Sequence, residues 1–147
     1  MSRIAEKAES ALDHREIFSK QQTLQETTVT EAISQSVAIS ALDLNAKAIL
    51  SSTVTGHTAR VVSKYRPKAP IIAVTTQERT MRQLSLVWGV TPVFGKVATS
   101  TDELLETAIQ GGKDSGLVQA GDLVVITAGI PLGRSGSTNL VKVSTIE

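Results

Sequence analysis

Three short apolar runs, separated by stretches of helical periodicity, most constrain the fold that this chain can adopt. The segments 71–76 and 122–127 contain the continuous apolar runs 71–74 and 123–126, and the segment 48–52 opens with a shorter apolar run. Runs of this length without polar alternation are typical of strands that are buried on both faces. Strands and helices therefore alternate along the chain. This alternation predicts an α/β fold in which helices cover both faces of a parallel sheet.

The ends of the expected helices follow from capping patterns and helix-breaking residues. Thr28 with Glu31, and Ser100 with Glu103, have the spacing of a capping box, which marks the start of a helix. Gly111 and Gly112 either end the last helix or destabilise it by about 1 kcal/mol each. The expected helices of the domain cover residues 28–44, 58–65, 78–88 and 100–115.

Two further strands are expected at the edges of the sheet. Residues 90–94 form one of them, and Pro92 favours an edge position because proline cannot donate a ladder hydrogen bond. Residues 140–146 form the other, in which Val141 and Val143 alternate with polar neighbours. Such alternation suits an antiparallel strand with one face in water.

The N-terminal part predicts a separate element. Residues 1–20 have the periodicity of an amphipathic helix, and the polar residues 21–27 are expected to link it to a domain at 28–147. The sequence offers no upstream segment to cover the apolar stripe of this helix. We therefore expect the helix either to pack on the domain or to belong to a part of the protein outside this sequence.

Composition limits the classes of function. The 147 residues suit one domain, and the net charge of +1, with both signs interspersed, favours no nucleic-acid partner. The sequence has no cysteine, and its two histidines, His14 and His57, are far apart. It therefore offers few ligands for a metal site. Since no run is long enough to span a membrane and no signal peptide is apparent, we expect a cytoplasmic protein without a membrane partner. The sequence also gives no basis for a Ser/His/Asp set, a pair of catalytic carboxylates or a metal cluster, so no catalytic site is predicted.

The segment after the first strand has the features of an anion-binding loop. Thr53, Thr55, Gly56 and Thr58 lie where a strand turns directly into a helix. The first N–H groups of a helix lack intrahelical partners, and the helix dipole adds partial positive charge there. The hydroxyl groups beside them complete a site for a phosphate. Ordinary helix capping is the alternative explanation.

A second loop, residues 129–139, is rich in glycine and in hydrogen-bond donors. Glycines allow it to move, and Arg134, Ser135 and Ser137 could donate to an anion. A flexible connector would have the same composition. If the first and fourth strands are neighbours, both loops lie at the switch point of the sheet, where ligands bind in α/β folds.

Several separate motifs give the chain a resemblance to a known family. They are the segment KYRPKAPIIAVT at 64–75, LVWGV at 86–90, GDLVVITAG at 121–129 and GSTN at 136–139. Together they resemble the carboxyl-terminal domain of pyruvate kinase, bacterial type, over residues 28–147. Residues 2–20, with ALDHR at 11–15, resemble the last helix of that family's catalytic barrel. The chain is therefore expected to be either a piece of a longer protein or a stand-alone chain.

The resemblance implies a three-layer α/β/α fold whose mixed five-stranded sheet has the order 3-2-1-4-5, with the last strand antiparallel. It implies a regulatory domain that binds a phosphorylated effector and helps to assemble a tetramer with its own catalytic barrel. That barrel, which transfers phosphate from phosphoenolpyruvate to ADP with magnesium and potassium, would be absent, so the chain itself would need no cofactor and would not be an enzyme. The alternative is a stand-alone α/β enzyme or binding protein that acts on a phosphorylated small molecule.

The family's effector loops map onto both loops described above. The residues implied to bind the effector phosphate are Thr53, Thr55, Gly56, His57, Thr58, Arg134, Ser135, Gly136 and Ser137. Val54 replaces a polar or basic residue of some relatives. Ser100 and Thr107 stand where members that bind fructose 1,6-bisphosphate have an aromatic residue and an arginine. A second phosphate thus lacks its obvious cation, and a monophosphate such as AMP or ribose 5-phosphate is as well suited as a bisphosphate.

Overall fold

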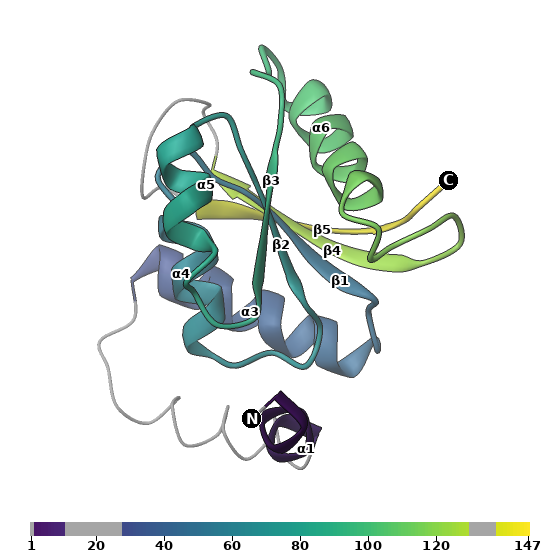
Figure 1. The fold of residues 1–147 in the computed structure, drawn as a ribbon. Coiled ribbons are helices and arrows are strands. Elements are labelled where there is room, and N and C mark those ends of the chain that lie inside the picture. Colours follow the sequence, from purple (N-terminus) through teal and green to yellow (C-terminus); the bar gives the residue numbers. More distant parts are fainter. Residues whose placement is uncertain (1, 11–27, 130–137) are drawn as a thin grey trace.

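The computed structural model describes residues 2–10, 28–129 and 138–147 and contains a mixed five-stranded sheet (Figure 1). The strands are β1 (Ala48–Ser52), β2 (Ile71–Thr75), β3 (Val90–Phe94), β4 (Leu123–Gly129) and β5 (Thr138–Thr145). Their order is β3-β2-β1-β4-β5, with every neighbouring pair parallel except β4 and β5. This confirms the predicted order and the predicted antiparallel last strand.

The helices that cover the two faces of this sheet make three layers with it. They are α3 (Val29–Asp43), α4 (His57–Lys64), α5 (Glu78–Leu84) and α6 (Thr101–Asp114). The N-terminal helix α1 (Ser2–Ser10) is not part of these layers. Figure 1 shows α3, α4 and α5 on one face of the sheet and α6 on the other. The predicted three-layer α/β/α architecture is therefore confirmed.

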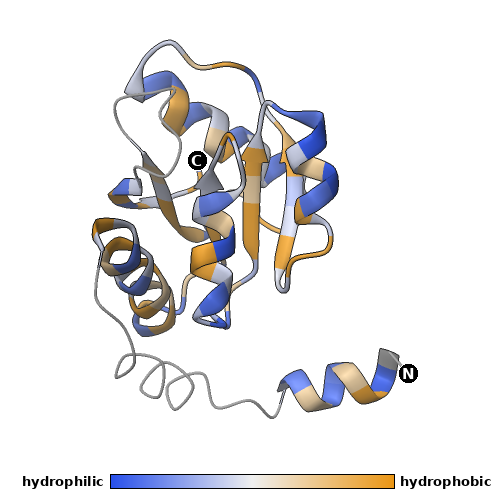
Figure 2. Ribbon diagram, turned by 90° about the vertical axis from the view of Figure 1, so that its left-hand side faces the viewer, coloured by the Kyte–Doolittle hydropathy of each residue, from blue (hydrophilic) through white to orange (hydrophobic). Residues whose placement is uncertain are grey.

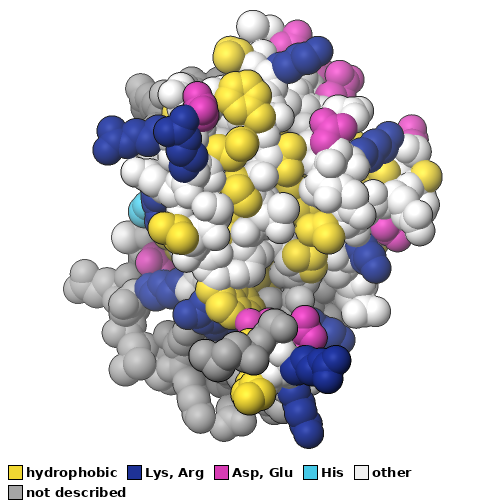
Figure 3. Space-filling model, viewed as in Figure 1, with side chains coloured by type: hydrophobic (Ala, Val, Ile, Leu, Met, Phe, Trp, Pro, Cys, Tyr) yellow, Lys and Arg dark blue, Asp and Glu magenta, His cyan; other side chains and the backbone are white. Residues whose placement is uncertain are grey.

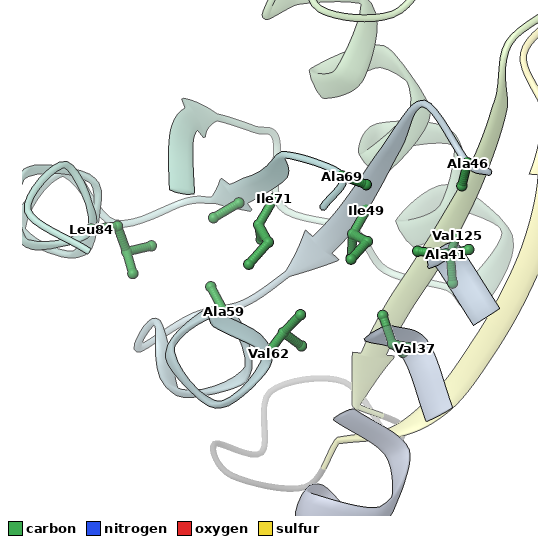
Figure 4. Close-up of a cluster of buried hydrophobic side chains, with 11 residues drawn as sticks. Val37, Ala41, Ala46, Ile49, Ala59, Val62, Ala69, Ile71, Leu84 and Val125 are labelled. Carbon is green, nitrogen blue, oxygen red and sulfur yellow. The ribbon is translucent and has the colours of Figure 1, made fainter. Parts of the chain in front are cut away.

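The buried strands supply a separate hydrophobic core to each face. Ile49 and Val125 point towards α3, α4 and α5, and their side chains pack with those of Val37, Val62 and Leu84 (Figure 4). Neighbouring strand residues such as Leu50 and Ile126 point to the α6 side. In Figure 2 the central strands are largely orange, the colour of hydrophobic residues. Burial on both faces accounts for the apolar runs without alternation.

Both edge strands occupy the positions that the sequence predicts. β3, which contains Pro92, pairs only with β2, and β5 pairs only with β4. Figure 3 shows hydrophobic side chains gathered along the β3 side of the molecule. The exposed large hydrophobic side chains of this region include Leu86, Phe94 and Val97.

Several element boundaries differ from the prediction. The helix expected at 78–88 ends at Leu84, because the following N–H groups of Leu86 and Val87 bond three residues back, to Gln83 and Leu84, in tighter turns. The strand expected at 140–146 begins earlier, at Thr138. The N-terminal helix covers Ser2–Ser10, and residues 11–27 of its predicted remainder and linker lie outside the described residues.

The capping residues of α3 also join that helix to α4. Thr28 accepts a hydrogen bond from the Glu31 N–H, as the capping box requires. The Glu31 carboxylate does not close the box, because it accepts instead from the Tyr65 hydroxyl and from the Lys64 ammonium. The Tyr65 hydrogen bond lowers the pKa of Glu31 against the opposing effect of burial. Burial, followed by the bond to Glu31, raises the pKa of Tyr65.

We expect Tyr65→Phe to lower the free energy of unfolding by about 1.5–3 kcal/mol at pH 7, the usual contribution of a hydrogen bond to a charged group. Because folding lowers the pKa of Glu31, its ionised carboxylate stabilises the folded state at pH values above its pKa in the unfolded chain. This stabilisation is lost as the pH falls through the pKa of Glu31 in the folded state. The difference between parent and Tyr65→Phe should therefore shrink below about pH 4. Urea unfolding at pH 7 and at pH 3 measures it, and an equal difference at both values would contradict the role of Glu31.

Candidate anion-binding site

The two predicted loops follow strands that lie side by side at the centre of the sheet. β1 pairs with β2 on one side and with β4 on the other, so the chain reverses direction across the sheet between β1 and β4. The loop after β1 leads into α4, and residues 130–137 follow β4. The switch point is therefore at the predicted place, where α/β folds have their ligand crevice.

Gly56 sets the shape of the first loop. It is the N-cap of α4 and has a φ of 87°, in the left-handed region that favours glycine. A Cβ atom at this position would lie 3.0 Å from Leu84 Cδ2. No side chain caps α4, and its first turn contains no acidic residue. The start of this helix therefore keeps its partial positive charge without a carboxylate beside it.

The residues before Gly56 fix the loop to the sheet. The Thr53 hydroxyl accepts a hydrogen bond of 2.9 Å from the Gly56 N–H, and the Thr53 N–H donates to the Val74 carbonyl at 3.0 Å. The Val54 carbonyl accepts from the Thr80 hydroxyl at 2.9 Å. The Thr53 hydroxyl therefore stabilises the loop itself, and hydrogen bonds to β2 and α5 hold the loop against the sheet.

The three other predicted residues of this loop differ in their accessibility. Thr55 and His57 are exposed, whereas Thr58 is 6% exposed. The Thr55 carbonyl accepts from Arg60 Nη1 at 3.0 Å, so this guanidinium braces the loop. The Thr58 hydroxyl is hydrogen bonded to the Thr138 hydroxyl. Of these three residues, Thr55 and His57 are the ones whose side chains are exposed to solvent.

The bond between Thr58 and Thr138 also joins the two predicted loops. Thr138 is the first residue of β5 and comes directly after the second loop. The four candidates Arg134, Ser135, Gly136 and Ser137 lie outside the described residues. The described end of the second loop therefore lies beside the first loop, while the placement of these four residues stays a prediction.

A cavity of 330 Å³ lies next to the first loop, on the α6 side of the sheet. Its lining includes Thr53 and Val54 from the loop, Thr107 from α6 and Lys96 from the segment after β3. Ser100, which the resemblance placed at the second phosphate, does not line this cavity. Its hydroxyl caps α6 by accepting a hydrogen bond from the Glu103 N–H. Sequence reasoning missed Lys96, although its position just after a parallel strand was a signal for the ligand edge of the sheet.

Residues 2–10, 28–129 and 138–147 contain no group of three or more His, Asp or Glu side chains that could hold a metal ion. Over the same residues, no helix has both the length and the apolar character that crossing a bilayer requires.

The fold and the loop define the class: an α/β domain with a doubly wound sheet, a preformed helix N-terminus at its switch point and an adjoining cavity. Residues 31–144 match the family model described as "Pyruvate kinase, alpha/beta domain". The chain therefore belongs to the pyruvate kinase alpha/beta domain family, and the resemblance stated from its motifs is confirmed.

Comparison with curated proteins agrees with this assignment. The chain is 53% identical to the pyruvate kinase of Geobacillus stearothermophilus over 146 residues, which are 99% of this chain and 25% of that protein. It is 45% identical to the pyruvate kinase of Sporosarcina psychrophila and 49% identical to that of Bacillus licheniformis, with the same coverage. The chain thus spans about a quarter of the length of these relatives.

Proposed function

We propose that this chain is the regulatory domain of a pyruvate kinase and binds a phosphorylated effector between its two switch-point loops. The observation that carries this proposal is the start of α4, which has no side-chain cap and no acidic residue in its first turn. Backbone N–H groups and the helix dipole favour a phosphate at such a helix start. Thr55 and His57 would contact the phosphate, and Arg134 to Ser137 would close over it.

In the longer protein that the relatives represent, the partner of this domain would be a catalytic barrel that transfers phosphate from phosphoenolpyruvate to ADP. The magnesium and potassium sites would belong to that barrel. The domain would also contribute to a homotetramer, since symmetric contacts between identical subunits are the common form of assembly. The 147-residue chain by itself is expected to transfer no phosphate. A coupled assay with phosphoenolpyruvate and ADP checks this, and turnover that co-purifies with the chain would contradict it.

The effector site is tested by replacing the exposed and buried threonines of the loop together. We expect Thr55→Ala with Thr58→Ala to weaken the binding of ribose 5-phosphate by tenfold or more. Thr55 would lose a charge-assisted hydrogen bond of about 1.5–3 kcal/mol, and Thr58 would lose the bond to Thr138 that joins the two loops. Calorimetric titration of parent and variant measures the change. A matched control is Thr91→Ala in β3, which changes a threonine at another part of the sheet. Unchanged affinity in the double variant would place the site elsewhere.

A further inference from the structure

Three buried hydroxyl groups have no hydrogen-bond partner within the part of the chain that the structure describes. They belong to Ser34, Ser51 and Thr127, and each of these residues is 0% exposed. Almost all buried polar side chains in proteins are hydrogen bonded, because removing a hydroxyl group from water without a new partner costs free energy. The positions of these three residues in the fold show whether they can share a partner.

The sheet places two of these residues side by side. Ser51 in β1 and Thr127 in β4 are direct partners in the parallel ladder, where neighbouring strands lie about 4.8 Å apart. Ile49 and Val125, two positions earlier, are also partners, and both pack with the side chains of α3. Because side chains alternate along a strand, Ser51 and Thr127 face the same side of the sheet as this pair. Their hydroxyl groups therefore lie on the α3 side.

The third residue, Ser34, lies on the stripe of α3 that packs on these strands. Ser34 precedes Val37 by three residues, and both are on the buried face of the helix. Val37 packs with Ile49 and Val125 (Figure 4). The turn at residues 44–47 joins the end of α3 to the start of β1, so the helix runs back along the strand. One turn before Val37, Ser34 is therefore level with the two strand hydroxyl groups.

The chemistry of this layer suits a small neutral ligand. Every buried polar side chain among the described residues is a serine or a threonine, so no buried charge is present to balance an ion. Ser34 and Ser51 have shorter side chains than Val37 and Ile49 in the neighbouring layer. In a close-packed interior, shorter side chains between the same helix and strands leave space of the order of one water molecule, about 30 Å³. Hydroxyl groups both donate and accept, and a buried water needs two to four such partners.

We propose that Ser34, Ser51 and Thr127 bind one internal water molecule, which joins α3 to the two strands of the switch point. The water supplies the hydrogen bonds that the three hydroxyl groups lack, and it links the helix to β1 and β4 at the same time. This site lies on the α3 side of the sheet, opposite the cavity on the α6 side. The inference does not depend on the proposed function, because it involves no phosphate.

The sign of the effect of Thr127→Val tests the site, because valine keeps the shape of threonine and removes only the hydroxyl group. If the hydroxyl binds the water, the equilibrium constant for folding should fall about fivefold, the usual effect of one lost hydrogen bond. If it binds nothing, the constant should rise, because an unpaired buried polar group has been removed. Urea unfolding of the 147-residue parent and variant measures the change. An unchanged or raised constant would overturn the proposal.

Ser34→Ala tests the helix side of the site, and Ser36→Ala is its matched control. Ser36 lies in the same helix but is exposed, and its hydroxyl donates to the Ala32 carbonyl. Both changes gain the same helix propensity, so their difference reports the environment of the hydroxyl group. We expect the folding constant of Ser34→Ala to be about fivefold below that of Ser36→Ala. Equal constants, or a higher constant for Ser34→Ala, would count against a water at Ser34.

A crystal structure of the chain observes the water directly. We expect one ordered water within hydrogen-bond distance of at least two of the three hydroxyl oxygens, and its loss or displacement in Thr127→Val. A structure in which no water lies between α3 and these strands, or in which the hydroxyl groups bond to protein atoms instead, would overturn the proposal even if both variants were less stable.

Discussion

Gly111→Ala is expected to destabilise the domain by about 2 kcal/mol, although alanine is normally the better helix residue. In an exposed helix this change would gain about 1 kcal/mol, and overpacking a core costs up to about 3 kcal/mol. The added Cβ would lie 2.5 Å from Val74 Cγ2. Val74 is 4% exposed and its other methyl group lies against Gly95, so it has little room to move. The free-energy cost of overpacking is therefore expected to exceed the gain from the higher helix propensity of alanine.

A double-mutant cycle with Val74→Ala isolates this contact. Once the valine methyl groups are removed, Gly111→Ala should be neutral or stabilising, because only the propensity gain remains. Urea unfolding of the four proteins gives the coupling free energy. The same loss in both backgrounds, or a parent that is stabilised by Gly111→Ala, would contradict the close packing of α6 on β2.

Gly56→Ala is expected to lower the free energy of unfolding by about 2–3 kcal/mol. A left-handed backbone costs a residue with a Cβ about 1–2 kcal/mol, and here the Cβ also meets Leu84, which is fully buried. The change should also weaken phosphate binding, because the N–H groups at the start of α4 would move.

Gly116 provides the matched control for this prediction. Its φ is 77°, close to that of Gly56, but a Cβ there would have nothing within 4 Å. Gly116→Ala should therefore show only the conformational cost of about 1–2 kcal/mol. Thermal or urea unfolding compares the two variants. Equal losses would mean that Leu84 moves aside without cost, and a loss below about 0.5 kcal/mol for Gly56→Ala would contradict the strained turn.

Much of the fold could be predicted because its signals are local. Apolar runs predict buried strands, Pro92 predicts an edge, and the alternation around Val141 and Val143 predicts the antiparallel strand. The strand order could not be predicted from periodicity. It was predicted from the resemblance to a family. Gly111 and Gly112 lie within α6, and the side chains of Val74 and Leu50 occupy the space that a Cβ atom at these positions would need. This close packing joins residues far apart in sequence, so the local pattern left open whether the two glycines end the helix.

The candidate site also has features that the local sequence predicts and features that depend on tertiary contacts. The loop from Thr53 to Thr58 could be predicted because a strand that turns directly into a helix exposes N–H groups wherever it occurs. The hydrogen bond from Gly56 to Thr53, the bond between Thr58 and Thr138, and the cavity at Lys96 depend on residues far apart in sequence. No local pattern contains such contacts, so the sequence predicted Thr53 and Thr58 as ligand contacts, with ordinary helix capping as the alternative, and did not predict these two hydrogen bonds.

The central claim, that the start of α4 holds a phosphate, is tested most directly by NMR. The backbone amide signals of the ¹⁵N-labelled chain are followed during titration with inorganic phosphate at constant pH and ionic strength. We predict that the largest saturable shifts belong to the amides of residues 55–59, since N–H groups at a helix start donate to the anion. Saturable shifts confined to another part of the chain, or none at these amides, would contradict the account.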